Sequence, residues 1–468
     1  MDYRVGGGGR TKVHQRIVRT PSVATRSDGG RPPPAQTEPP DIEYALRPLV
    51  ALSALVGVPP CRPRRSALLD AASRAYSLAV VGCLAYMGYA TAAYIVEAYG
   101  ATCHSYYVPE FVGRSVVSCA ACVSVLSLLL ARGDWLSVFS AEIRQVDDLL
   151  AVDKWKAHRA TKFYLYTSLG LLLAGYTVNV VWDVIAISPY DSLVEIIEFV
   201  IVVTFEQFLM FALIIKYRFL LLNETVLHLF SSQLKTFREM NVPTINSGQC
   251  HLRYLHPSGM DDSPKQSTWP VSCDQLLTIK VAHMKLTKLA DALNDVYTVP
   301  ITVMAFQALV TIVQVVFNIL LCLLDQDEDN DKMILPDVCY LFMTVTSVLA
   351  LTYCCECTTS QARRTASIAE DLVLANAAVG GSEAFSQQLR QLSRQVRHNP
   401  VMFSACSLFS VDASLLTGFM STVATYSIIL LQFVVSNTGC ALGGGPANSM
   451  GVDVNETTSS APEDTQYS

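Results

Sequence analysis

Residues 309–324 read LVTIVQVVFNILLCLL, an uncharged stretch whose only polar side chains are Thr311, Gln314 and Asn318. Extended back to residue 299, it is long enough to cross the hydrocarbon core of a bilayer, which takes about 20 apolar residues. Similar apolar runs lie at residues 169–181 and 427–435. A chain with several such runs is predicted to be a membrane protein.

The overall composition supports this interpretation. Of 468 residues, 51% are hydrophobic and 16% are charged, with a mean hydropathy of +0.34, whereas soluble chains carry about 25% charged residues. The net charge of -6 leaves no basic excess to neutralise a phosphate backbone, which argues against nucleic acid as a partner. The 14 Cys lack zinc-site spacing, and we recognise no catalytic triad, paired carboxylates or phosphate-binding loop. We expect no enzymatic activity, no cofactor and no metal.

Hydropathy over windows of about 19 residues predicts seven transmembrane helices. They lie at residues 76–96, 115–131, 163–187, 194–215, 299–324, 338–355 and 411–435. The predicted fold is therefore an all-α membrane protein.

The positive charges predict its orientation. All but two of the 34 Lys and Arg residues precede the first span or lie between the second and third, fourth and fifth, or sixth and seventh spans. Cytoplasmic loops retain positive charge, so the N-terminus is predicted to be cytoplasmic and the C-terminus extracellular. This is the reverse of a G-protein-coupled receptor.

Several helices are predicted to continue beyond the bilayer. Residues 191–242 and 337–379 contain neither Pro nor Gly, and residues 274–299 and 383–398 have helical patterns. We expect these cytosolic extensions to pack as a helical bundle. Residues 45–436 form the predicted seven-span domain, and residues 243–272 form a cytosolic loop inside it.

The two ends of the chain have the composition of disordered segments. Residues 1–44 are predicted to be a disordered cytosolic tail, and residues 437–468 a disordered extracellular tail.

The last predicted span contains a family signature. Residues 425–433 read TYSIILLQF, which resembles the Thr-Tyr, five apolar residues, Gln-Phe motif of insect gustatory receptors, and residues 403–409 are also similar to that family. The matching motif residues are Thr425, Tyr426, Gln432 and Phe433.

The resemblance implies a ligand-gated, nonselective cation channel in the plasma membrane of sensory neurons. Its partners would be a small-molecule tastant, permeating cations, membrane lipid and other gustatory receptors in a homo- or hetero-tetramer. Ser427 stands where the sugar-receptor branch commonly has Glu. A bitter compound is the favoured tastant, ahead of fructose or another sugar. The alternatives are a metabotropic seven-helix receptor and, less favoured, a transporter.

Residues 411–435 would form the pore helix. Polar side chains recur on one face of it at helical spacing: Ser414, Thr417, Ser421, Thr425, Gln432 and Ser436. By resemblance, Ile429 and Phe433 match an apolar constriction and Gln432 a polar ring. The predicted pore residues are Thr425, Ile429, Gln432, Phe433 and Ser436. The alternative is that the small hydroxyls only allow close helix packing.

A second set of residues is predicted to bind the ligand. It comprises Tyr176, Asn179, Trp182 and Asp183 in the third span, Glu198 and Phe199 in the fourth, and Gln314 and Asn318 in the fifth. Aromatic faces beside acceptors suit a polyol, or an amine held by a carboxylate. Aromatic residues near a span end are also typical interfacial anchors, and buried amides often bond between helices.

Two further features each have a functional and a structural interpretation. Glu206 lies near the middle of the fourth span, where an ionisable residue suggests function or a structural pair. Cys354, Cys355 and Cys357 lie at the cytosolic end of the sixth span and suggest palmitoylation or helix packing.

Two N-glycosylation motifs test the orientation. Asn223-Glu224-Thr225 is predicted to lie inside, and Asn455-Glu456-Thr457 outside. Glycans are added only on the lumenal side, so we expect Asn455 to be a glycosylation site and Asn223 not to be one.

Overall fold

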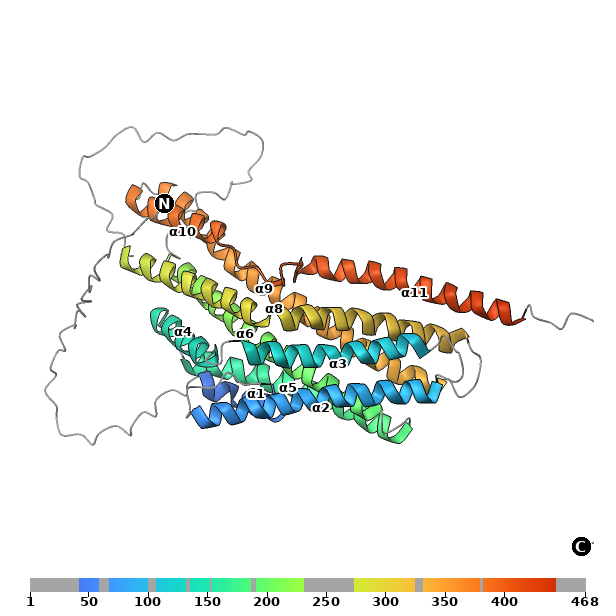
Figure 1. Cartoon of the computed structure of the whole chain (residues 1–468). Helices are drawn as coiled ribbons and strands as arrows, with labels where there is room; N and C mark the ends of the chain where they lie inside the picture. The colour runs from blue at the N-terminus through green and yellow to red at the C-terminus, as the bar shows by residue number, and fades with distance from the viewer. Residues whose placement is uncertain are drawn as a thin grey trace, which may run out of the picture. The chain divides into compact units, whose positions relative to one another are not determined.

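The computed structural model describes residues 42–58, 67–99, 107–131, 135–151, 154–186, 191–230, 273–324, 331–378 and 382–442, and this part of the chain is almost entirely α-helical (Figure 1). The helices are α1 (Ile42–Leu55), α2 (Ala67–Tyr99), α3 (Tyr107–Leu130), α4 (Trp135–Leu149), α5 (Lys154–Ala186), α6 (Asp191–Leu229), α8 (Cys273–Leu324), α9 (Asp331–Ala378), α10 (Glu383–His398) and α11 (Ala413–Leu442). Strands β1 (Ser404–Ala405) and β2 (Phe409–Ser410) pair antiparallel between α10 and α11.

The predicted all-α membrane fold is confirmed. Within the described residues, six helices are long and apolar enough to cross a bilayer, namely α2, α3, α6, α8, α9 and α11. The remaining predicted span lies in α5, a helix of 33 residues. Two boundaries differ from the sequence prediction, since α1 begins at Ile42, inside the predicted tail, and α11 continues to Leu442. The predicted loop at residues 243–272 lies outside the described residues.

Helix α6 forms the centre of the packing. It contacts α3, α5, α8 and α9, and α8 in turn packs on α3 and α9. In the most apolar section of α6, 78% of the residues are buried, against 6% in α11. Helix α6 therefore belongs to the core of the single chain, whereas α11 leaves most of its surface uncovered.

Helices α6, α8 and α9 are 39, 52 and 48 residues long. At 1.5 Å per residue the longest spans about 78 Å, far more than the roughly 30 Å of hydrocarbon. Each helix therefore extends beyond the membrane, as the absence of Pro and Gly from residues 191–242 and 337–379 predicts for α6 and α9. Residues 274–299 and the fifth predicted span form one continuous helix, α8, that includes Pro300.

Helix α4 was not predicted. It has only 15 residues and includes Asp147 and Asp148, so it is too short and too polar to register as a span. One face carries Trp135, Phe139 and Ile143, all buried. These aromatic side chains pack on Phe211 of α6, with the Phe139 and Phe211 ring centroids 4.8 Å apart.

A buried ion pair joins α4 to α6. The Arg218 Nε and Nη2 atoms donate to the two carboxylate oxygens of Asp147 at 3.1 and 3.0 Å. Arg218 is 0% exposed and Asp147 is 2% exposed. The pair is bidentate and shielded from water, which is the geometry in which an Arg–carboxylate contact is strongest.

The side-chain amide of Asn223 joins the same part of α6 to α9 through hydrogen bonds. The Asn223 Nδ2 donates to the backbone carbonyl of Gln361 at 2.9 Å, and the Thr365 hydroxyl donates to the Asn223 Oδ1 at 2.8 Å. Asn223 is 1% exposed, so this glycosylation motif lies inside the helix packing.

The cysteines of α9 have different environments. Cys354 and Cys355 are buried, with the Cys354 Sγ 3.9 Å from the carbonyl oxygen of Leu209, and Cys357 is half-buried. For Cys354 and Cys355, burial favours helix packing over palmitoylation.

Candidate functional site

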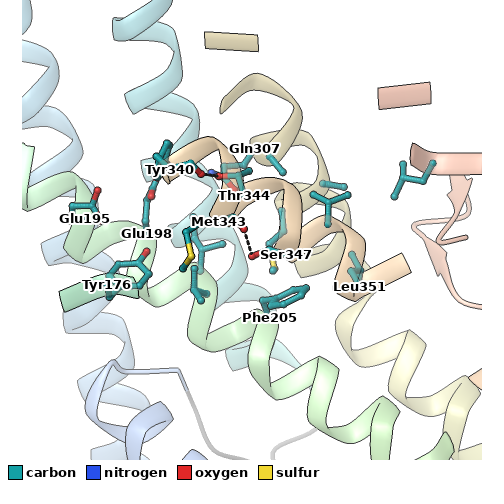
Figure 2. Close-up of a pocket in the computed structure, with 17 residues that line it drawn as sticks. Tyr176, Glu195, Glu198, Phe205, Gln307, Tyr340, Met343, Thr344, Ser347 and Leu351 are labelled. Atoms are coloured by element: carbon teal, nitrogen blue, oxygen red, sulfur yellow. Dashed lines mark hydrogen bonds between the residues drawn. The ribbon is translucent and has the colours of Figure 1, made fainter. Parts of the chain in front are cut away.

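A cavity of about 100 Å³ lies among α5, α6, α8, α9 and the start of α11 (Figure 2). A single water molecule needs roughly 10–15 Å³ when cavity volume is defined in the same way, so this cavity is large enough for a small organic molecule. Its lining residues are Tyr176, Glu195, Glu198, Ile201, Val202, Phe205, Met304, Ala305, Gln307, Ala308, Tyr340, Met343, Thr344, Ser347, Val348, Leu351 and Leu415.

One end of the cavity, the carboxylate end, consists of Tyr176, Glu195, Glu198 and Tyr340. Glu195 and Glu198 are one turn apart on α6, so that both reach the same cavity. The Tyr340 hydroxyl donates to the Glu198 carboxylate, which is 7% exposed. This end therefore concentrates negative charge next to two aromatic rings.

The other end, the apolar end, is formed by Phe205, Leu351 and Leu415. Figure 2 shows Glu195, Glu198 and Tyr176 on one side of the cavity and Phe205 and Leu351 on the other. The cavity thus has a polar end and a hydrophobic end.

Leu415 comes from the first turn of α11, the helix that carries the family signature. This contact puts the cavity next to the base of the predicted pore helix.

Of the residues predicted to bind ligand, the structure brings Tyr176 and Glu198 together in this cavity. Phe199 lies behind them, with its ring centroid 5.0 Å from that of Tyr176. Gln314 and Asn318 are not among the lining residues, and Gln314 packs against Gly113 of α3 at a point that leaves no room for a Cβ atom. The side chains of Asn179, Trp182 and Asp183 lie outside the described part of the structure. Ligand binding by this set stays a prediction.

The sequence analysis did not predict the cavity-lining residues that α9 contributes. Tyr340, Thr344, Ser347 and Leu351 recur at steps of four, three and four, which places them on one helix face. This pattern was a usable signal, but it is interrupted by apolar residues that belong to other faces of α9.

Glu206, the other ionisable residue of this span, does not line the cavity. It is buried and accepts a hydrogen bond from the Ser168 hydroxyl of α5. This contact favours the structural interpretation of Glu206.

On α11, the polar stripe is exposed in the single chain. Ser414, Thr417, Ser421, Thr425 and Gln432 are exposed, as are Ile428 and Ile429, at 56% and 51%. The Thr425 hydroxyl donates to the Ser421 carbonyl at 2.8 Å, so it is satisfied within its own helix. The side chains of Phe433 and Ser436 lie outside the described residues.

The start of α11 is fixed by an N-cap just before the apolar section of that helix. The Asp412 Oδ1 accepts the backbone N–H of Ser414 at 2.9 Å, and the Ser410 hydroxyl donates to the Asp412 Oδ2 at 2.7 Å. Hydrogen bonds from Ser414 and Ser410 lower the pKa of the Asp412 carboxyl from its ordinary value. The cap stays ionised at neutral pH and stabilises the helix start.

The hairpin that precedes this cap is attached to α8 beside Pro300. The Asn294 Oδ1 accepts the Ser404 N–H at 2.9 Å, and the Thr298 Oγ1 accepts the Cys406 N–H at 2.6 Å. The base of α11 is therefore held by the same helix that contributes Met304 to the cavity.

The described residues offer no cluster of three His, Cys, Asp or Glu side chains that could hold a metal ion. The chemistry available in the cavity is that of carboxylates, aromatic rings, hydroxyls and an amide.

A bundle of long apolar helices, with a cavity among them, defines a multi-pass membrane protein. The family model of the 7tm chemosensory receptors matches residues 46–437, and the chain belongs to this family. None of the curated protein sequences matches the chain.

Solved structures of similar fold include the insect olfactory receptor OR5 from Machilis hrabei. That structure has a TM-score of 0.56 and 14% sequence identity, and the match covers 84% of this chain and 98% of OR5. The structure of OR5 in complex with eugenol matches with a TM-score of 0.57, the same identity and the same coverage. At this identity the likeness is one of fold.

Proposed function

We propose that the chain is a gustatory receptor, a ligand-gated, nonselective cation channel in the plasma membrane of sensory neurons. A tastant bound in the cavity opens the channel. As the tastant, a bitter compound is favoured over fructose or another sugar. Membership of the chemosensory receptor family supports this proposal, as does the structure of a fold relative with the small molecule eugenol bound.

The observation that carries the proposal is the position of Leu415. It lines the cavity and belongs to the first turn of α11, so a ligand in the cavity would press on the base of the pore helix. A ligand shifts an equilibrium only through contacts that differ between the two states. Leu415 offers such a contact directly.

The exposed face of α11 supports the pore. The Thr417 and Thr425 hydroxyls donate to backbone carbonyls of α11 itself, whereas the Gln432 amide would be costly against lipid, so this face favours water or another protein surface. The family resemblance implies four copies around one axis. In that arrangement the polar face of α11 would contact both water and a neighbouring copy, and the other exposed helix faces would contact membrane lipid. Other gustatory receptors would replace some copies in a hetero-tetramer.

Recordings from cells that express the chain alone would test this function. We expect a bitter-compound panel to evoke cation currents that persist in excised patches without guanine nucleotides, because the channel is the receptor itself. We expect Leu415→Ala to shift the concentration dependence at least severalfold, while Leu408→Ala, on the exposed hairpin loop, has no effect. Currents that vanish on excision would support the metabotropic alternative, and currents limited by turnover would support the transporter.

The glycosylation motifs give a separate test of the proposed orientation. We expect Thr457→Ala to abolish a glycosidase-sensitive mobility shift and Thr225→Ala to leave it unchanged. These changes remove each acceptor motif while they spare Asn223, whose amide joins α6 to α9. A shift that depends on Thr225 would place α6 with its C-terminal end outside and reverse the orientation.

A further inference from the structure

We propose that Gly175 and Met343 together set the upper size of the ligand, so that the cavity takes a compact molecule of about one small ring. The absent side chain at position 175 leaves the space that the end of the Met343 side chain occupies, and this keeps Met343 from filling the cavity. The inference rests on the proposed function, because it names the size class of ligand and the residues that select it at the same site.

The contact between α5 and α9 is the first argument. A Cβ atom at position 175 would overlap the terminal methyl group of Met343 and lie 3.2 Å from its sulfur. An alanine at this position would therefore displace the end of the Met343 side chain. Methionine is unbranched and has three rotatable bonds, so its end would move before the backbone of either helix does.

The position of Met343 is the second argument. Met343 lines the cavity and lies between Tyr176 and Ser347 in Figure 2. Tyr176 follows Gly175 directly, and its ring is held in place by Phe199, with the ring centroids 5.0 Å apart. The open space next to the end of Met343 is the cavity itself. A Met343 side chain that is pushed away from position 175 is therefore expected to enter the cavity.

The volume of the cavity is the third argument. The cavity measures about 100 Å³, and an apolar cavity of about 150 Å³ binds benzene. A molecule of about one small ring is therefore the most that the cavity accepts without a movement of its walls. A sulfur and a methyl group that enter a space of this size would exclude part of such a ligand. Removal of the same two atoms would admit a larger one.

Two probes with the same polar group measure the size limit. We would measure binding of benzyl alcohol and of the larger 4-tert-butylbenzyl alcohol to the purified full-length chain, from saturable ligand-induced shifts in thermal stability over a concentration series. We expect the unaltered chain to bind the smaller probe at least as tightly as the larger one. Met343→Ala should tighten binding of the larger probe about tenfold relative to the smaller, because one extra methylene group changes the affinity of an apolar pocket about tenfold or more.

Glycine variants assign the limit to the contact between Gly175 and Met343. We expect Gly175→Ala to weaken benzyl alcohol binding about tenfold, because the end of Met343 then occupies the cavity. The double variant Gly175→Ala with Met343→Ala should recover the binding. Gly170→Ala is the matched control, since it adds the same methyl group to the same helix, where a Cβ atom would meet no other described residue within 4 Å. It should leave the affinities for both probes unchanged.

The outcomes separate this inference from the proposed function. The inference is wrong if the unaltered chain prefers the larger probe or shows no saturable binding of either. It is also wrong if Gly175→Ala behaves like Gly170→Ala, or if the double variant does not recover the binding, whatever the currents show. Probe binding that depends on Met343 in this way, without any ligand-evoked current, would uphold the inference and count against the channel.

Discussion

Replacing Arg218 with Met is expected to destabilise the protein by about 3–5 kcal/mol, because it leaves the Asp147 carboxylate buried without its partner. Asp147 is 2% exposed, so water cannot replace the two hydrogen bonds it receives from Arg218. The midpoint of thermal unfolding in detergent, read from the surviving monodisperse fraction after heating, measures the loss. We expect reduced surface expression in parallel.

Two further variants separate a buried pair from an ordinary surface pair. The double variant Arg218→Met with Asp147→Leu removes both charges, and we expect it to recover most of the lost stability, because an apolar pair of similar volume often equals a buried ion pair. Arg397→Met removes the exposed pair with Glu370, whose charged atoms are 2.6 Å apart, and is expected to cost less than about 1 kcal/mol. If Arg218→Met behaves like Arg397→Met, the bidentate contact does not hold α4 on α6.

Gln432 variants are expected to change ion permeation most strongly. Gln432 is exposed on the same helix as Thr425 and Ile429, and in a tetramer it would form a ring around the ion path. We expect Gln432→Glu to favour cations and to alter divalent permeation or block, because charges a few ångströms from an ion interact by roughly 1–4 kcal/mol. Gln432→Arg is expected to suppress cation current for the opposite reason. Reversal potentials and divalent block measure both effects.

The apolar constriction has its own matched variants. We expect Ile429→Ser to wet the constriction and raise current in the absence of ligand, since hydrophobic rings gate by excluding water. Ile429 is 51% exposed, whereas its neighbour Leu430 is half-buried on another side of the helix, so Leu430→Ser is the control. Unchanged reversal potential and block in Gln432→Glu at normal surface expression would show that Gln432 does not line the pore.

Part of the candidate site was predictable because its residues stand out in a local stretch of sequence. Glu198 is a charge inside an apolar span, and Tyr176 is an aromatic residue within another. Gln314 shows the limit of this reasoning. Its spacing on α8 suggested a ligand contact, but the small Gly113 lets α3 approach and gives the amide a different neighbour.

The sequence by itself determined the class of protein. Apolar spans of about the length that a bilayer requires, Lys and Arg almost confined to alternate loops, and the TYSIILLQF motif at residues 425–433 are all properties of local segments. Each can be recognised without knowledge of what packs against it. The long extensions of α6 and α9 were likewise predictable, because helix breakers are absent from them.

Only the tertiary structure decided which of these segments meet. The cavity combines Tyr176, Glu198, Tyr340 and Leu415 from four helices, and the Arg218–Asp147 pair joins residues far apart in the chain. Such contacts depend on the rotation and depth at which each helix packs, and these are set by the summed burial of many side chains. Periodicity places a residue on a helix face, whereas packing determines whether that face meets a cavity, another helix or lipid.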